Sequence, residues 1–168
     1  MIISVASGKG GTGKTTIAVN LSLSLKNVQF MDCDVEEPNG HLFLKPQIYE
    51  KISSGIPVPK VDESKCTYCG ECAKVCEFSA IVVIKEKILF FPELCHGCGA
   101  CSYICPVNAI SEVEREIGII ERGKSGNIDF IHALLNVGEP MAPPLIRKEK
   151  KLINNQKIVI IDSSPGTS

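Results

Sequence analysis

Nine cysteines occur in this chain of 168 residues, and eight of them follow one repeated spacing. The segments CTYCGECAKVC (66–76) and CHGCGACSYIC (95–105) both read C-x2-C-x2-C-x3-C. The N-terminus runs directly into a short apolar segment and has no signal peptide, so we expect a cytoplasmic protein. Cysteines remain reduced in the cytoplasm, and a dense repeated set there indicates metal binding rather than disulfides.

This spacing is typical of bacterial ferredoxins that hold two [4Fe–4S] clusters, in which the fourth cysteine of each repeat completes the cluster of the other repeat. It predicts one cluster bound by Cys66, Cys69, Cys72 and Cys105, and a second bound by Cys95, Cys98, Cys101 and Cys76. Zinc, which also accepts four thiolates, is the alternative. Pro106 follows Cys105, whereas Glu77 replaces proline after Cys76, so the local turn of the first repeat is an open question.

A second set of residues that could bind a ligand or take part in catalysis is the glycine-rich segment SGKGGTGKTT (7–16). It contains G-x4-G-K-T between a strand-like and a helix-like segment, the context in which such a loop wraps backbone N–H groups around phosphate. We expect Lys14 to reach the β- and γ-phosphates of ATP and Thr15 to bind Mg²⁺. The full predicted nucleotide site comprises Gly8, Gly10, Gly11, Thr12, Gly13, Lys14, Thr15 and Thr16.

The loop also contains a second lysine, Lys9, at its start. KGGTGKT (9–15) resembles the KGGxGK[ST] signature of the deviant Walker A ATPases, which include nitrogenase iron protein, the MinD and ParA ATPases and the Mrp-type iron–sulfur carriers. The resemblance implies a homodimer in which Lys9 contacts the nucleotide of the partner subunit. A surface lysine without this role is the alternative.

Two aspartate-containing segments extend the resemblance. Asp32-Cys33-Asp34 is similar to the switch I segment of that family, which implies that Asp34 orients or deprotonates the attacking water. Asp162-Ser163-Ser164-Pro165-Gly166-Thr167 resembles switch II, which implies that Asp162 binds Mg²⁺ through water and that the Gly166 amide senses the γ-phosphate. Asp32 either holds a water of Mg²⁺ or ends its strand, and Cys33 is either a buried apolar residue or a redox-active thiol.

The elements that must position these residues suggest an α/β fold. Apolar segments Ile2–Ala6, Val28–Met31 and Lys157–Ile161 predict parallel strands, and helices are expected over Thr15–Leu25 and from Pro143 to about Leu152. We therefore expect a P-loop NTPase fold over residues 1–59 and 113–168, with an inserted α+β ferredoxin-like domain over 60–112. The whole chain resembles MinD-superfamily ATPases with such an insert. Family members continue beyond switch II with adenine-contacting segments, so we expect a truncated chain with an incomplete sheet.

Composition narrows the function. The net charge of −1 argues against a nucleic-acid surface, and no apolar run is long enough for a membrane span. The leading hypothesis is a homodimeric ATPase that couples its nucleotide state to electron transfer with an unidentified redox partner. An iron–sulfur carrier or scaffold is the alternative, and a MinD-type positional switch is the third. We expect ATP hydrolysis from a longer chain that includes the base site rather than from residues 1–168 alone.

Overall fold

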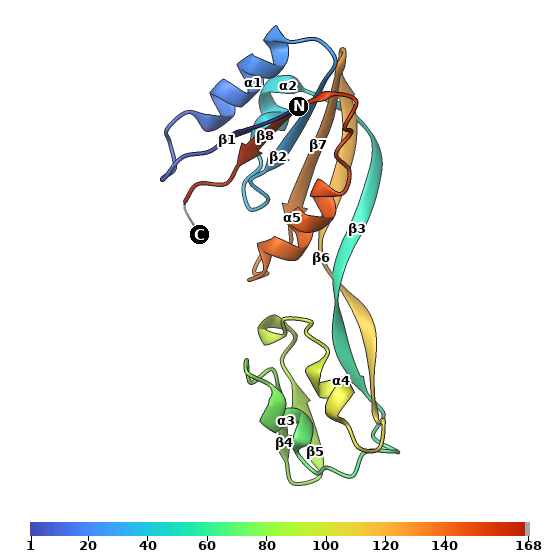
Figure 1. Ribbon diagram of the computed structural model, residues 1–168. Helices are drawn as coiled ribbons and strands as arrows, with labels where there is room; N and C mark the ends of the chain where they lie inside the picture. Colours follow the sequence, from blue (N-terminus) through green and yellow to red (C-terminus); the bar gives the residue numbers. More distant parts are fainter. Residues whose placement is uncertain (167–168) are drawn as a thin grey trace. The chain divides into compact units, whose positions relative to one another are not determined.

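The computed structural model describes residues 1–166, which form two compact units (Figure 1). The sheet unit comprises residues 1–54 and 117–137 together with the residues from Ala142 onward, and the cysteine unit comprises Gly55–Glu116 and Gly138–Met141. The expected limits were 59/60 and 112/113, and both the expected and the observed limits lie within two long strands, residues 47–61 and 110–125. No helix within the described residues is long and apolar enough to cross a membrane.

One mixed sheet contains six of the strands, in the order β1-β8-β2-β7-β6-β3. The first four neighbours are parallel, and β6 is antiparallel to β7. Their bounds are β1 Ile2–Val5, β8 Ile158–Ser163, β2 Val28–Cys33, β7 Ile128–Leu135, β6 Ile110–Ser125 and β3 Gln47–Val61. The three apolar segments expected to form parallel strands therefore lie side by side, as an α/β fold requires.

Helices cover the parallel part of this sheet. Helix α1 (Lys14–Ser24) packs on β1, β2 and β8, and α5 (Ala142–Lys150) packs on β7. Phe30 and Phe130 stack at 5.7 Å between ring centroids in a buried core that also contains Ala18 and Val19 of α1 and Leu44 of α2 (Gly40–Leu44). Because β2 is buried along its whole length, its carboxyl end is firmly fixed.

The long strand β3 was not predicted from the sequence. Pro57 and Pro59 within β3 argue against a strand, since proline has no N–H to donate to a ladder. However, β3 is the last strand in the sheet order, and prolines are tolerated in such edge strands.

The cysteine unit contains short elements that repeat. They are α3 (Glu71–Val75), β4 (Ile81–Ile84), β5 (Lys87–Phe90), a 3₁₀-helix η1 (Pro92–Leu94) and α4 (Ala100–Ile104). Gly70 and Gly99 precede the two helices with φ of 79° and 75°, a left-handed conformation that favours glycine. A backbone hydrogen bond closes the turn after each helix. In the first repeat, Ser79 N–H donates to the Cys76 carbonyl at 3.1 Å. The equivalent bond joins Asn108 N–H and the Cys105 carbonyl at 3.2 Å, so Glu77 permits the same turn as Pro106.

Candidate functional site

The glycine-rich loop borders an open pocket at the carboxyl end of the parallel strands. The pocket is lined by Gly10, Gly11, Gly13, Lys14, Thr15, Thr16, Asp34, Glu37, Asn39, Leu42, Phe43 and Pro165. Gly11 and Gly13 have φ of 71° and 85°, and Gly13 precedes the first turn of α1. Helix α1 therefore begins at this pocket, and the unpaired N–H groups at the start of a helix favour anion binding.

The two lysines of the loop have different environments. Lys14 is 9% exposed and lines the pocket. Lys9 is exposed and is not among the residues that line it. A contact of Lys9 with the nucleotide of a partner subunit therefore remains a prediction.

Asp162 near the end of β8 is a buried carboxylate that needs a counter-ion. It is 1% exposed, and neither side-chain oxygen accepts a hydrogen bond from any described residue. Burial raises the pKa of Asp162, while the nearby Thr15 hydroxyl and Lys14 ammonium act in the opposite direction. Because an unpartnered buried carboxylate is costly, Asp162 and Thr15 fit a magnesium site well.

Asp32 lies next to Asp162 in the sheet register, but its side chain is fully used by the chain itself. Its oxygens accept from the N–H groups of Gly40 at 2.7 Å and Asp34 at 3.2 Å. Burial raises the pKa of Asp32 to about 7. A Cβ on Gly40 would lie 2.5 Å from the Phe30 ring, so glycine is required for this close approach. Asp32 therefore shapes the loop that presents Asp34.

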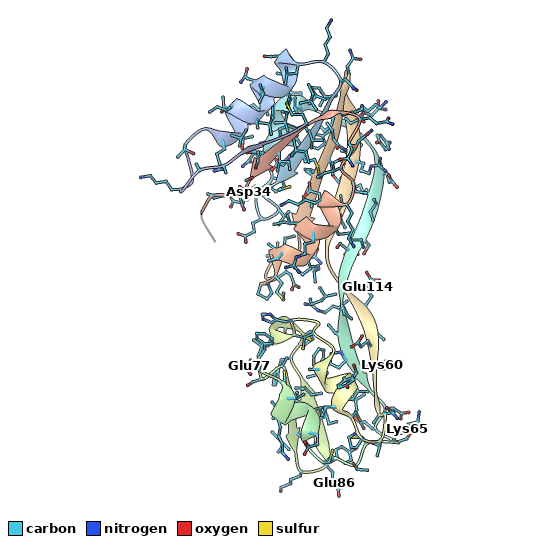
Figure 2. The ribbon with its side chains drawn as sticks, viewed as in Figure 1. Asp34, Lys60, Lys65, Glu77, Glu86 and Glu114 are labelled. Atoms are coloured by element: carbon cyan, nitrogen blue, oxygen red, sulfur yellow. The ribbon has the colours of Figure 1, made fainter. Side chains whose placement is uncertain are left out.

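Asp34 itself lines the glycine-loop pocket, at the end of the β2 strand (Figure 2). Burial raises its pKa, the Lys14 ammonium lowers it, and Asp162 raises it further. These effects place the three charged groups near one another around the space where a terminal phosphate would lie. A carboxylate with a raised pKa at this position can orient a water or accept its proton.

The remaining predicted residues of this region support the loop. The Thr12 hydroxyl donates to Ser7 Oγ at 2.7 Å. Gly166 N–H donates to the Ser7 carbonyl at 3.1 Å, so in this structure that amide contacts the glycine loop. Gly8 belongs to the loop but does not line the pocket, and Thr167 lies outside the described residues.

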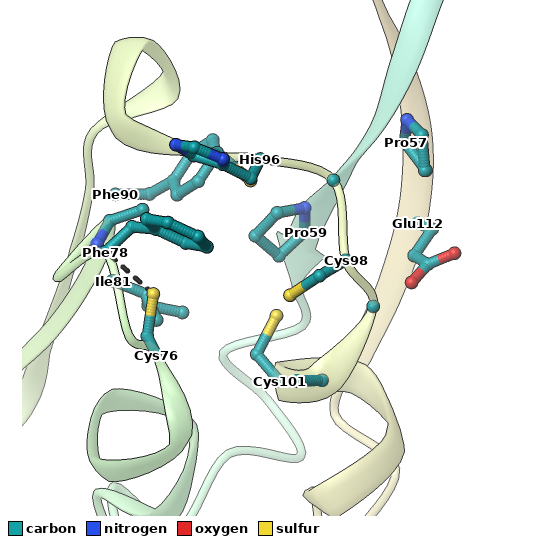
Figure 3. Close-up of a pocket in the computed structure, with 15 residues that line it drawn as sticks. Pro57, Pro59, Cys76, Phe78, Ile81, Phe90, His96, Cys98, Cys101 and Glu112 are labelled. Atoms are coloured by element: carbon teal, nitrogen blue, oxygen red, sulfur yellow. Dashed lines mark hydrogen bonds between the residues drawn. The ribbon is translucent and has the colours of Figure 1, made fainter. Parts of the chain in front are cut away.

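The eight repeated cysteines gather around two separate pockets. The first pocket is lined by Cys66, Cys69, Cys72 and Cys105, with Val83 and Ile110 among its apolar neighbours. The second pocket is lined by Cys76, Cys95, Cys98 and Cys101. Figure 3 shows Cys76, Cys98 and Cys101 directing their sulfur atoms into the second pocket. The fourth cysteine of each repeat thus joins the first three of the other.

Backbone N–H groups support individual sulfur atoms. Cys76 Sγ accepts from Ala80 N–H at 3.3 Å, and the equivalent Cys105 Sγ accepts from Ala109 N–H at 3.2 Å. Burial raises the pKa of the Cys72, Cys95 and Cys101 thiols, so their thiolate forms need a positive partner. Among residues 1–166, no three His, Cys, Asp or Glu side chains converge tightly enough for one metal ion. Four sulfurs around a pocket suit a polynuclear cluster better than a single zinc.

Sequence reasoning missed several residues near these sites. Phe78 stacks on His96 with ring centroids 3.5 Å apart, and both line the second pocket (Figure 3). Glu149 of α5 is fully buried near Cys33, and burial raises the pKa of Glu149 to about 8. Cys33 is 4% exposed, and burial also raises the pKa of its thiol, as expected for a small core residue. These neighbours are distant in sequence, and no local pattern signals them.

Comparisons with known proteins match both units. A family model described as NUBPL iron-transfer P-loop NTPase, of the ParA group, matches residues 1–74, and a 4Fe-4S dicluster domain matches residues 59–112. An uncharacterised protein of Methanocaldococcus jannaschii is 34% identical over 99% of this chain. The chain spans 62% of the length of that relative.

Two further relatives match part of the chain. An ATP-binding protein of Methanocaldococcus jannaschii is 48% identical over 40% of this chain and 27% of its own length. An iron–sulfur protein required for NADH dehydrogenase, from Arabidopsis thaliana mitochondria, is 41% identical over 34% of this chain and 21% of its own length. Residues 1–74 thus match the ParA-like P-loop NTPases and residues 59–112 match a 4Fe–4S dicluster domain, and the phosphate loop and the cysteine pockets agree with these two matches.

Proposed function

We propose that this protein binds Mg-ATP in the sheet unit and two [4Fe–4S] clusters in the cysteine unit, and couples its nucleotide state to electron transfer. The observation that carries the proposal is the separation of eight cysteines into two complete sets of four in a chain that also has a phosphate loop. Each pocket has its own full ligand set, which suits clusters that stay bound while electrons move between them. The clusters would supply one-electron chemistry.

Hydrolysis would use residues of the glycine-loop pocket. Lys14 and the backbone N–H groups of the loop would bind the β- and γ-phosphates, and Thr15 and Asp162 would hold Mg²⁺, the latter through water. Asp34 would orient the attacking water. The Gly166 amide would leave the Ser7 carbonyl to contact the γ-phosphate, which gives switch II two alternative partners.

The exposed position of Lys9 supports a homodimer. A lysine that contacted its own nucleotide would be expected among the residues that line the pocket, but Lys9 is exposed and does not line it. We propose that it reaches the nucleotide of the partner subunit, so that ATP binding and dimer formation depend on each other.

Iron content and redox titration test the proposal. Anaerobically purified protein should contain about eight iron atoms per chain. In a longer chain that includes the base site, saturating Mg-ATP should shift at least one cluster potential. Reciprocity then requires that reduction change the affinity for ATP by the same free energy. Stoichiometric zinc, or potentials that do not respond to nucleotide, would rule out ATP-coupled electron transfer.

A second candidate function is delivery of iron–sulfur clusters, favoured by the family model described as an iron-transfer P-loop NTPase. A carrier must release its cluster, whereas an electron carrier must keep it. Mixing iron-57-labelled protein with an excess of an apo-ferredoxin, with and without Mg-ATP, separates the two. Transfer of label would favour the carrier, and full retention would favour electron transfer.

A further inference from the structure

An ion pair in the cysteine unit has no role in the site described above. Arg115 Nη1 donates to Glu139 Oε2 at 2.6 Å, and Nη2 donates to Oε1 at 3.0 Å. The side chains are 24% and 4% exposed, respectively. Such a two-bond, largely buried arginine–carboxylate pair is stronger and more rigid than a surface salt bridge.

Arg115 is close to the loop that carries the ligands of the second pocket. The backbone of Gly55 in β3 closely approaches that of Arg115, since a Cβ added to Gly55 would lie 2.6 Å from the Arg115 carbonyl oxygen. Gly97 approaches β3 in the same way, since a Cβ added there would lie 2.9 Å from the Pro57 carbonyl oxygen. Residues 55–57 of β3 therefore lie between Arg115 and the loop that contains Gly97.

Glu139 occupies an unusual place in the chain. It lies between β7 and α5, which both belong to the sheet unit, but its own segment, Gly138–Met141, belongs to the cysteine unit. The segment is therefore held by chain continuity at both ends and by Arg115 in the middle. Only residues 136–138 separate the end of β7 from Glu139.

The end of β7 is bonded to the switch I segment. Leu135 N–H donates to the carbonyl of Val35, the residue after Asp34, at 2.8 Å. Asn136 N–H then donates to the Ile117 carbonyl of β6 at 2.9 Å, two residues from Arg115. Two hydrogen bonds and short stretches of chain therefore connect Asp34 in the glycine-loop pocket to the neighbourhood of the Arg115–Glu139 pair.

We propose that Arg115 and Glu139 set the reduction potential of the cluster in the second pocket, and that switch I acts on this cluster by changing how completely Glu139 neutralises Arg115. The proposal rests on the proposed function, since it names the residues that transmit the nucleotide state. A positive charge beside a cluster favours its reduced, more negative form. Withdrawal of Glu139 would therefore raise the potential, and restoration of the pair would lower it.

Single substitutions test the electrostatic part without nucleotide. Glu139→Gln should raise the potential of one cluster, Arg115→Gln should lower the potential of that same cluster, and Arg115→Lys should leave it close to wild type. A purely structural pair would instead produce shifts of one direction, or shifts of both clusters. Either result, or an unchanged potential in all variants, would overturn the proposal.

Another ion pair provides a matched control. Arg122 on β6 and Glu50 on β3 lie 2.6 Å apart, but in the sheet unit. Arg122→Gln and Glu50→Gln should shift neither cluster. Potentials would be measured by redox titration followed by electron paramagnetic resonance, with Cys98→Ala identifying the signal of the second cluster by its loss.

Saturating Mg-ATP tests the route. The nucleotide-dependent shift of the second cluster should disappear in Glu139→Gln, while nucleotide binding itself is retained. A shift that persists in this variant would overturn the route. If nucleotide does not change the wild-type potentials, both the proposed coupling and the route are wrong. Whether the pair acts on the cluster is then decided by the shifts of Glu139→Gln and Arg115→Gln measured without nucleotide, which should be opposite in sign.

Discussion

The sheet unit and the cysteine unit position their functional residues by different means. In the sheet unit, a core of large apolar side chains such as Phe30 and Phe130 fixes strand ends, and the ends present carboxylates. In the cysteine unit, the core cluster contains only three buried residues, Cys72, Ile81 and Ile110, and further cysteines pack against it. The first unit can therefore fold around its own side chains, whereas the second includes its metal ligands in its core. This difference predicts that the units respond to different perturbations.

The largest expected effect is the removal of iron. Because metal binding contributes directly to the folding free energy of small metal domains, chelation should unfold the cysteine unit and leave the sheet unit folded. Hydrogen exchange would show loss of protection at α3 and α4, with protection retained in β1, β2 and β8. Equal protection of both units after chelation would contradict the comparison.

The next prediction distinguishes the two clusters of the cysteine unit. Cys105→Ser should remove the cluster whose other ligands lie in the first repeat, and Cys76→Ser should remove the other. Each variant should lose about half of its iron, or about four atoms per chain. Loss of the cluster from the same repeat as the substituted cysteine would show that the exchange of ligands between repeats is wrong.

A pair of lysine variants examines the sheet unit. Lys14→Ala should weaken ATP binding by about 10- to 100-fold, since a hydrogen bond to a charged group contributes about 1.5–3 kcal/mol. Lys9→Ala should retain binding by the single subunit but lose ATP-dependent dimerisation. Calorimetry and analytical ultracentrifugation measure the two properties, and iron content should be unchanged in both variants. Equal loss of binding would place Lys9 in its own subunit's site.

The pH dependence of stability should also belong to the sheet unit. Glu149 is fully buried, its two oxygens accept no hydrogen bond from described residues, and its folded pKa is about 8 against an ordinary value of 4.5. The folded state therefore keeps a proton that the unfolded state has lost, so stability falls as pH rises through this window and levels off above about 8.

Glu149→Gln should remove this loss, which amounts to about 1.4 kcal/mol per pH unit at most. Asp32, whose pKa is about 7, adds a slope in the same direction, so the contribution of Glu149 is the difference in slope between wild type and Glu149→Gln over the same interval, pH 7 to 8. Urea unfolding of the sheet unit at these two pH values provides the measurement. A slope that is unchanged in the variant would mean that Glu149 is already ionised in the folded protein.

The smallest effect concerns the one irregularity of the cysteine repeat. Because the turns after Cys76 and Cys105 are equivalent, Glu77→Pro should be accepted and should stabilise the cysteine unit by about 0.4–1 kcal/mol through the unfolded state. The reverse change, Pro106→Glu, should destabilise it by a similar amount. Thermal unfolding of the iron-loaded protein provides the measurement, and a loss of iron in Glu77→Pro would show that the turns differ.

Local sequence patterns predicted three of the parallel strands (β1, β2 and β8), the glycine loop and the helix that follows it, because each depends on residues adjacent in the chain. The two prolines within residues 47–61 concealed β3, since proline argues against a strand except at the edge of a sheet. Asp32 also could not be interpreted from sequence, because its role depends on the distant N–H of Gly40.

The grouping of the cysteines followed from spacing, but their surroundings did not. Phe78 and His96 stack across 18 residues of chain, and Arg115 and Glu139 pair across 24. Such contacts are set by the path of β3 and β6 and by the segment after β7. A single sequence contains no local signal for these long-range contacts.

Because the repeats exchange their fourth cysteine, half of the cysteine unit does not contain a full ligand set for either pocket. Either half of the cysteine unit alone would hold three ligands for one pocket and a fourth that belongs elsewhere. Two copies of the same half, however, would complete each other's sets by reciprocal exchange. The unit is thus an internal pseudo-dimer, and a synthetic peptide covering one repeat should assemble its clusters only as a pair of chains.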